Sequence, residues 1–291
     1  MNIIHRIKVV TILASASLCG VAASISYAAS VDSMAFTGEL LGGQQDGVDV
    51  TSLYATVTTP PRYPWAMHVE AVSDDAGDDT LQGIGAHFYF KQAEWGLVGI
   101  TTMKASIDLA ETDEFPAIKN LEVSTYGFEA EGRFTNLVIA LQSGMIDSDD
   151  VDFADDTYTK LELNWDASES WSFVAGSYKF AGDSTNFIEA DYSYLLNGYL
   201  AGAYVGATWD AFENVYVGLE FGPASMARTN WKVFAEYNNG EDNYDAVFLG
   251  VRFEFGPADS APILSVFDRN TGGYSFGSTK SSSMGGGKGM M

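Results

Sequence analysis

Hydrophobic and polar residues alternate along positions 243–255, which read N-Y-D-A-V-F-L-G-V-R-F-E-F. Every second position from 247 onward is apolar, in the order Val247, Leu249, Val251, Phe253 and Phe255. The positions between them mix small, aromatic and charged residues. Because the side chains of a β-strand point alternately to its two faces, this pattern predicts a strand with one apolar and one mixed face.

Strand-length runs continue from residue 31 onward with almost no helical periodicity. Each has about ten residues, the length that a tilted strand needs to cross a bilayer. The predicted strands are 33–41, 47–58, 65–73, 80–91, 94–109, 120–131, 133–144, 157–166, 169–180, 185–196, 199–210, 213–222, 229–239 and 243–255. We therefore predict an all-β fold, a transmembrane antiparallel up-and-down barrel of about fourteen strands, with twelve as the alternative count.

Aromatic residues stand at the ends of several apolar faces. Trp231 and Tyr237 bracket Val233, and Tyr199 and Trp209 bracket a longer apolar face. Aromatic girdles lie where a membrane barrel meets the lipid headgroups. The strands of a soluble β-sandwich would also alternate apolar and polar residues, but they would not need aromatic residues at their ends. The candidate girdle residues are Trp65, Trp95, Trp165, Tyr199, Trp209, Trp231 and Tyr237.

The connections between the predicted strands alternate in length. Short turns at 91–94, 131–133, 166–169 and 196–199 alternate with long or acidic connections at 74–79, 110–119, 145–156 and 181–184. Outer-membrane barrels have short periplasmic turns and longer external loops. The alternation therefore places both ends of the barrel on the short-turn side. Because every backbone group must be paired in lipid, the sheet is expected to close on itself.

The N-terminal residues have the features of an export signal. His5, Arg6 and Lys8 precede an apolar stretch at 9–25, and Ser26-Tyr27-Ala28 is an acceptable cleavage site. We predict a cleaved signal peptide over 1–28, the alternative being an uncleaved anchor. Cleavage removes Cys19, the single cysteine, so the mature chain would have no disulfide.

The composition narrows the function classes. Asp and Glu number 39 against 15 Lys and Arg, which argues against nucleic-acid binding because phosphates require basic groups. A hydrophobic content of 46% is too high for a disordered acidic chain.

The leader, the alternating strands and a strand that ends in Phe255 together resemble the porin-like outer-membrane β-barrels of Gram-negative bacteria, over roughly 31–255. The resemblance implies a barrel over 29–256 in the outer membrane, surrounded by lipid. It also implies that Val251, Phe253 and Phe255 form the signal read by the barrel-assembly machinery. Association with further copies is left open. The Gly/Ser-rich tail 257–291 departs from the pattern and is expected to be a flexible periplasmic extension, although 262–267 is apolar enough to dock inside the barrel.

The mixed faces of the strands supply candidate pore-lining groups. A barrel of this size is wider than the filled eight-stranded type and narrower than the sixteen-stranded porins. Charges of both signs facing a lumen set its ion preference, and acidic groups are in excess here. The candidates are His68, Glu70, His87, Lys104, Lys160, Glu162, Glu189, Asp191, Glu220, Lys232, Glu236, Arg252 and Glu254.

Metal and cofactor chemistry finds little support in the sequence. The acidic stretch with Asp147, Asp149, Asp150 and Asp152 is a weak divalent-cation candidate in an external loop. It has Asp152 where an EF-hand needs Gly and Tyr158 where it needs Glu. A solvated acidic loop explains it as well. We expect no cofactor and no firm metal site.

Three functions are carried forward. The first is a channel for passive diffusion of small solutes or ions, leaning to cations. The second is a non-conducting structural or adhesive surface barrel with acidic external loops. The third is a barrel enzyme that uses His68, Glu70 and His87, which fall on adjacent predicted strands. No G-x-S-x-G motif accompanies them, so an enzyme is not expected.

Overall fold

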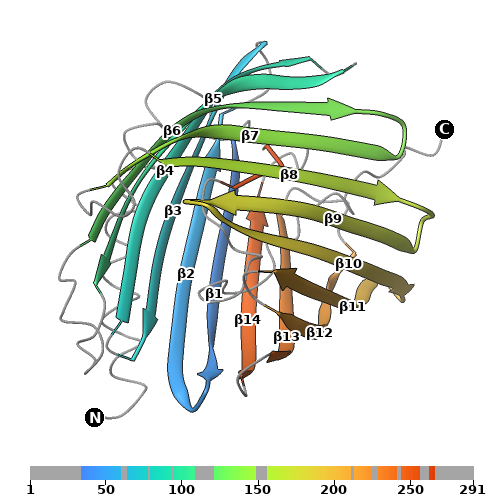
Figure 1. Ribbon diagram of the computed structural model, residues 1–291. Helices are drawn as coiled ribbons and strands as arrows, with labels where there is room; N and C mark the ends of the chain where they lie inside the picture. Colours follow the sequence, from blue (N-terminus) through green and yellow to red (C-terminus); the bar gives the residue numbers. More distant parts are fainter. Residues whose placement is uncertain are drawn as a thin grey trace.

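The computed structural model describes residues 34–59, 64–77, 79–92, 95–108, 121–148, 156–210, 213–224, 229–240, 244–255 and 262–265. Within these residues, fourteen antiparallel strands form one closed barrel (Figure 1). Each strand pairs with its neighbours in the chain, and β1 pairs with β14. The strands are β1 (Ala35–Gln45), β2 (Val48–Thr58), β3 (Trp65–Ala76), β4 (Asp79–Gln92), β5 (Gly96–Asp108), β6 (Leu121–Arg133), β7 (Leu137–Ser148), β8 (Asp156–Asp166), β9 (Trp171–Phe180), β10 (Asp183–Leu196), β11 (Tyr199–Asp210), β12 (Asn214–Pro223), β13 (Thr229–Gly240) and β14 (Asp245–Phe255). The predicted all-β barrel is confirmed, with fourteen strands rather than the alternative of twelve.

The seam between β1 and β14 closes the sheet. Ten residue pairs join the two strands, from Phe36 opposite Phe255 to Gln45 opposite Ala246. Glu39 lies directly opposite Arg252 in this register. Closure leaves no strand edge with unpaired backbone groups, which is the condition for a sheet to stand in lipid.

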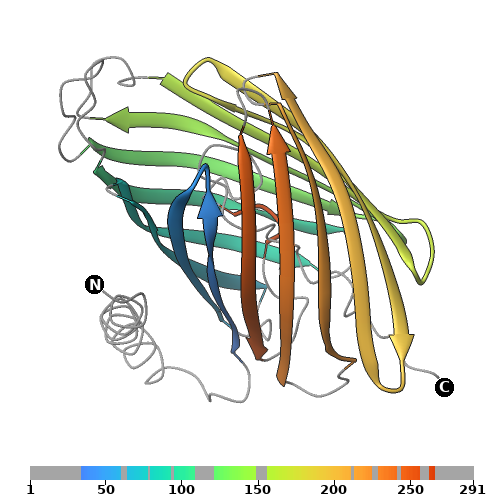
Figure 2. The ribbon, with the colours of Figure 1, turned by 90° about the horizontal axis from the view of Figure 1, so that it is seen from below.

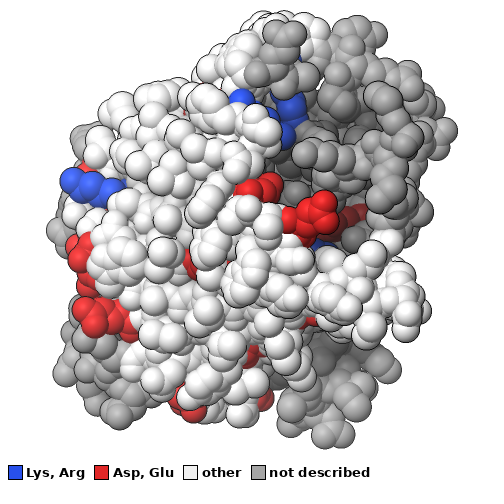
Figure 3. All heavy atoms as spheres, turned by 90° about the vertical axis from the view of Figure 1, so that its right-hand side faces the viewer, with Lys and Arg blue, Asp and Glu red and all other residues white. Residues whose placement is uncertain are grey.

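The two faces of the sheet differ in polarity, in the reverse sense to a soluble protein. Large apolar side chains are exposed on the outside, among them Leu249 at 64%, Ile100 at 63% and Leu219 at 62%. The buried inward-facing side chains include many acids and amides, such as Glu70 and Gln142. Figure 3 shows one side of the molecule, on which uncharged side chains cover most of the described surface and the charged ones gather in small groups.

The ends of the barrel form two rims. We call the rim that carries Ala35 and Phe255 the terminal rim, and the opposite one the far rim. Twelve residues separate β5 from β6 at the far rim, and seven separate β7 from β8. All the other connections between strands have two to six residues. The predicted alternation therefore holds best in the middle of the chain.

The predicted long acidic connection at 74–79 is wrong. Strand β3 continues through Ala76 and β4 begins at Asp79, so only two residues connect them. Gly77 has φ of +68°, a left-handed conformation that glycine adopts without a steric penalty and that allows this tight turn. The connection at 181–184 is likewise a two-residue turn, in which Ala181 and Gly182 both have positive φ.

Aromatic side chains on the outer surface gather at the terminal rim. Trp65 stacks on Phe88 with ring centroids 5.4 Å apart, and Trp171 lies 5.0 Å from Tyr192. Tyr199 stacks on Phe221 at 5.2 Å. All seven candidate girdle residues are exposed on the outside. By their positions in the strands, Trp65, Trp95, Trp165, Tyr199 and Trp231 lie at the terminal rim, and Trp209 and Tyr237 lie toward the far rim.

Several predictions concern other parts of the chain. The signal peptide at 1–28, residues 29–33 and most of the tail lie outside the described residues, so the proposed division of the chain stays a prediction. Among the described residues, no helix is long and apolar enough to cross a membrane.

Candidate functional site

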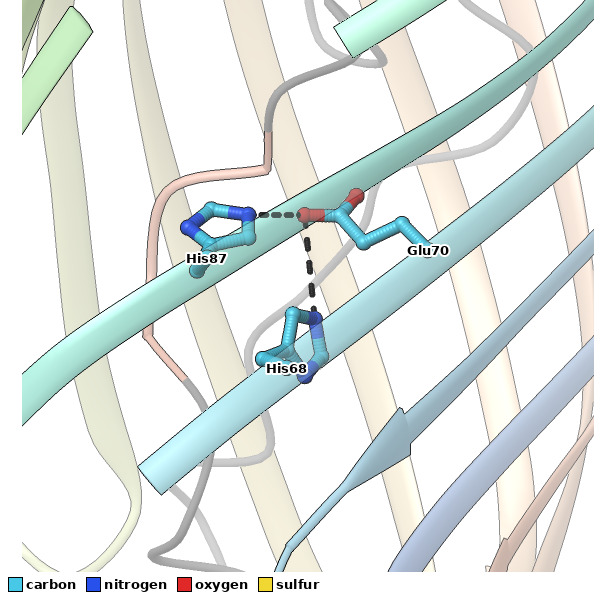
Figure 4. A group of neighbouring side chains, drawn as sticks. All are labelled: His68, Glu70 and His87. Carbon is cyan, nitrogen blue, oxygen red and sulfur yellow. Dashed lines mark hydrogen bonds and ion pairs between the residues drawn. The ribbon is translucent and has the colours of Figure 1, made fainter. Parts of the chain in front are cut away.

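Two histidines face each other inside the barrel. His68 on β3 and His87 on β4 are register partners, and their rings lie 5.2 Å apart, edge to face. Both belong to the inward-facing set of their strands, as does Glu70, two residues beyond His68. Figure 4 shows the carboxylate of Glu70 between the two rings. The sequence-based expectation that these three residues are neighbours is correct.

Glu70 is the centre of this cluster. Its Oε1 lies 2.6 Å from His87 Nε2 and 3.7 Å from His68 Nε2. Its other oxygen, Oε2, accepts a hydrogen bond from the hydroxyl of Tyr54 on β2 at 2.8 Å. Glu70 and His87 are fully buried and His68 is 4% exposed, so these contacts are shielded from solvent.

The second nitrogen of each histidine ring has its own partner. His87 Nδ1 lies 2.7 Å from Glu129 Oε2, from β6, and His68 Nδ1 lies 2.7 Å from the hydroxyl of Thr58, from β2. These partners fix the rotation of both rings. As a result, both Nε2 atoms are directed at the same carboxylate oxygen.

A short segment from beyond the last strand, Pro262–Ser265, lies against this cluster inside the barrel (Figure 2). The Ser265 hydroxyl donates to Glu70 Oε2. The backbone of the segment makes three further bonds to inward-facing side chains. Gln142 Nε2 donates to Leu264 O at 3.2 Å, Lys160 Nζ donates to Ser265 O at 3.0 Å, and Ile263 N donates to Glu131 Oε2 at 3.1 Å.

An apolar contact completes the docking of this segment. Leu264 is 3% exposed and packs in a cluster with Ala140, Tyr178 and Phe187. Burying a leucine side chain contributes about 1.5–3 kcal/mol. The segment therefore has both polar and apolar anchors on the inner wall.

A second charged cluster occupies the inner wall near the seam. Arg252 donates through Nε to Glu39 Oε2 at 2.7 Å, and its Nη2 lies 2.5 Å from the same oxygen. Lys232 Nζ lies 3.7 Å from Glu220 Oε2. Glu236 accepts hydrogen bonds from the Tyr204 hydroxyl and from the Asn238 amide, both at 2.8 Å.

Twelve of the thirteen candidate pore-lining residues face the interior. Ten of them are buried, and Lys232 and Glu254 are partly buried. The exception is Lys104, whose prediction is wrong. Its side chain is 59% exposed on the outer face, where it pairs with Glu122 at 2.7 Å. Strand β5 turns Thr101, Met103 and Ala105 inward, and Lys104 faces outward, opposite Ile84 of β4.

Several residues of the inner cluster were missed by the sequence analysis. These are Tyr54, Thr58, Glu129, Gln142 and Ser265. Glu129 stands on β6, whose sequence shows no clean apolar face because both of its faces carry mixed residues. The alternation of Glu129 and Glu131 with Phe128 and Ala130 was the available signal.

The remaining candidates are placed as follows. Phe253 and Phe255 are exposed on the outer face of β14, and Val251 is partly buried there. Asp147 is an exposed residue of β7 rather than of a loop, whereas Asp149, Asp150 and Asp152 lie outside the described residues. Among the described residues, the one group of His, Cys, Asp or Glu side chains spaced to hold a metal is His68, Glu70 and His87.

The closed sheet, its apolar outer face and its charged inner face together decide the architecture. The chain folds as a closed, porin-like β-barrel. No family model and no curated protein matches the sequence.

Solved structures with a similar fold include the CymD monoaromatic hydrocarbon channel, at 7% identity and a TM-score of 0.49, covering 78% of this chain and 89% of that one. The Acinetobacter baumannii outer membrane protein Omp33 is 12% identical with a TM-score of 0.48, covering 77% and 99%. The KdgM porin is 10% identical with a TM-score of 0.38, covering 75% and 98%. These scores are low, and the architecture stands on the strand pairing and the two faces.

Proposed function

We propose that this protein is an outer-membrane channel for passive diffusion of small solutes or ions, with a preference for cations. The observation that carries the proposal is the reversed polarity of a closed barrel: apolar side chains outside and charged side chains inside. An apolar outer face with aromatic residues at its rim is suited to lipid. A charged inner face is suited to water or to a polar solute.

The cation preference is supported by the buried charges. Among the described residues, ten buried Asp and Glu residues face two buried Lys and Arg residues, Lys160 and Arg252. The acids are Glu39, Glu70, Asp74, Glu129, Glu131, Glu162, Glu189, Asp191, Glu220 and Glu236. The balance of charges that line a pore sets the sign of the ion that passes.

The orientation in the membrane follows from the rims. The two longest connections, of twelve and seven residues, are at the far rim, which we place outside the cell. The terminal rim, with both ends of the barrel, then faces the periplasm. In this arrangement Val251, Phe253 and Phe255 reach the periplasmic side, where they would be read by the assembly machinery. Divalent cations at the acidic external connections and association with further copies are further proposals.

A second candidate is a barrel that does not conduct. It is favoured by one specific observation, the segment Pro262–Ser265 anchored across the interior. A barrel of fourteen strands is wide enough to hold chain as well as water. If this segment stays docked, the barrel is a structural or adhesive surface protein, or a channel that opens only when the segment leaves.

The third hypothesis, a barrel enzyme, gains nothing from the geometry. Both ring nitrogens of His87 are held by carboxylates, and the hydroxyl of Ser265 is bonded to Glu70 rather than to a histidine. An acyl-transfer site would need a nucleophile bonded to its general base.

The test is single-channel recording in planar bilayers, with the full chain compared to a chain that ends at Gly256. Heat-modifiable migration on gels confirms that both are folded. Conductance steps from the full chain, with a reversal potential in a salt gradient that indicates cation selectivity, would support the open channel. Steps from the shortened chain alone would show that the tail closes it. If both chains are folded and neither conducts, the channel is refuted in favour of the non-conducting barrel.

A further inference from the structure

We propose that His68, Glu70 and His87 form a binding site for a borderline transition-metal ion of the Zn²⁺ class inside the barrel. The ligands would be His68 Nε2, His87 Nε2 and Glu70 Oε1. This site is independent of whether the barrel conducts.

The positions of the three donor atoms support this inference. Each residue offers one ligand atom, and the three atoms lie within 4.8 Å of one another. Ligands on one tetrahedral zinc ion, with bonds of about 2.0–2.1 Å, lie about 3.3 Å apart. The two distances to Glu70 Oε1 are 2.6 Å and 3.7 Å, on either side of that value. Small rotations of the side chains would bring the three atoms to metal-binding distances without moving the strands.

The partners of the histidines provide the second, independent observation. Metal-binding histidines almost always donate their other ring nitrogen to a carboxylate, a carbonyl or another polar group, which fixes the ring and its tautomer. His87 has Glu129 in this place and His68 has the Thr58 hydroxyl, both at 2.7 Å. The rings are therefore already oriented for binding through Nε2.

The chemistry of the ligands selects the ion. Two imidazoles and one carboxylate suit Zn²⁺, Cu²⁺, Ni²⁺ or Co²⁺, whereas Ca²⁺ and Mg²⁺ prefer sets of oxygen atoms. Glu70 and Glu129 also supply two carboxylates that balance the charge of a divalent ion in a buried place. Binding replaces the hydrogen bond between His87 and Glu70 with two metal bonds, and the proton of that bond leaves to solvent.

The metal site and the docked tail share one residue. A metal ion on Glu70 Oε1 leaves Oε2 bonded to Tyr54 and Ser265. Because the same carboxylate holds both, occupancy of the metal site and docking of Pro262–Ser265 are thermodynamically linked.

The experiment titrates Co²⁺ into the metal-free full chain, folded in detergent, and follows the d–d absorption bands. We expect one Co²⁺ per chain with the strong bands of a four-coordinate, nitrogen-containing site, displaced by Zn²⁺. The weak bands of a six-coordinate oxygen site would mark adventitious binding to the acidic surface. Weak bands alone, or no binding by the folded wild type, would overturn the proposal without any variant.

Variants locate the site. The substitutions His68→Gln and Glu70→Gln each remove a ligand and should weaken binding by at least about 100-fold. Thr58→Val removes the hydroxyl that holds the His68 ring and should weaken binding by about 10-fold. Glu162→Gln is the matched control, because Glu162 is also buried and also accepts a tyrosine hydroxyl, that of Tyr178 at 2.7 Å. It should leave the affinity unchanged.

The doubly substituted chain His68→Gln/His87→Gln gives the sharpest test. The chain has three histidines, and the third, His5, lies in the predicted leader. A mature chain with both substitutions that keeps the strong Co²⁺ bands would refute the site. Loss of the bands in that folded variant, together with their retention in Glu162→Gln, would establish it.

Discussion

The buried ion pair across the seam should be needed for closure of the barrel, and Arg252→Met tests this. Glu39 and Arg252 are register partners of the first and last strands and are 2% and 6% exposed. Their closest contacts are 2.5 Å and 2.7 Å. Two unit charges about 4 Å apart attract by about 4 kcal/mol at an effective dielectric constant of about 20.

Removing one member of a buried pair leaves the other charge uncompensated, at a cost of about 3–5 kcal/mol. We expect this loss in the free energy of unfolding for Arg252→Met and a similar one for Glu39→Met. Replacing both partners removes both charges, and such double replacements are often neutral or better. The double variant should therefore regain most of the loss, giving a coupling energy of about 3 kcal/mol or more.

The assay is equilibrium unfolding in urea, followed by tryptophan fluorescence and by gel migration without boiling. The pair Lys104–Glu122 is the matched control. Its contact is also 2.7 Å, but its side chains are 59% and 48% exposed. An exposed pair contributes about 0–1 kcal/mol, so Lys104→Met should cost little. If Arg252→Met costs no more than Lys104→Met, burial does not set the strength of the seam pair and the reasoning is refuted.

Three further substitutions test other parts of the structure. Leu249 lies on the outer face of β14 and is 64% exposed. Leu249→Arg should lower the free energy of unfolding, measured by folding into vesicles, by about 2–4 kcal/mol if that face lies in lipid, but by less than about 0.5 kcal/mol if it lies in water. Gly218→Val should lower the free energy of unfolding in urea by about 1–3 kcal/mol, because a Cβ at this position would lie 2.0 Å from Tyr204 Cζ. Gly42→Ala is the control and should have a mild effect, because the atom nearest to a Cβ at Gly42 is 3.9 Å away. Glu189→Gln removes one of the ten buried acids and should lower the cation-to-anion permeability ratio, and an unchanged reversal potential would show that this side chain does not face the conduction path.

The alternation of side chains predicted most of the barrel, because it follows from a local property of each strand. Where one face meets an apolar phase and the other a polar one, the period of two is plain in the sequence. The clearest runs gave the best boundaries, and predicted strand 199–210 coincides with β11. The candidate pore-lining residues of β10–β14 also face the interior as predicted; they are Glu189, Asp191, Glu220, Lys232, Glu236, Arg252 and Glu254.

The sequence-based predictions were wrong where the two faces of a strand have similar residues, or where a tight turn determines how far the strands extend. The inward and outward positions of β5 both carry small and polar residues, so Lys104 was assigned to the wrong face. The acidic stretch at 74–79 resembled a loop because Asp74 and Asp75 are poor strand formers. They remain in the ladder, opposite Leu81 and Thr80, because Gly77 allows the strands to run to the turn.

The inner cluster could be predicted only in part. His68 and His87 stood out because the predicted barrel contains no other histidine, and the hairpin brings them together. Glu129 is separated from His87 by 42 residues, and their contact depends on the register of β4, β5 and β6 together, which no local pattern specifies. Thr58 is the register partner of His68 across β2 and β3, but nothing in the strand pattern singles out this threonine.

The chain beyond β14 does not interfere with the pairing of β14 and β1 that closes the barrel. An extension after the last strand departs from the usual pattern, yet β14 keeps ten residue pairs with β1. Phe255 ends at the terminal rim, and the segment Pro262–Ser265 lies inside the barrel. Its partners Glu131, Gln142 and Lys160 stand on β6, β7 and β8, which lie half-way around the ring from β14. The described segment therefore lies against the wall opposite β14. It is held there by backbone groups of Ile263, Leu264 and Ser265 and by the side chains of Leu264 and Ser265. An extension of this kind leaves the pairing of β14 with β1 intact and places a short segment of chain against Glu70, the residue at the centre of the proposed metal site.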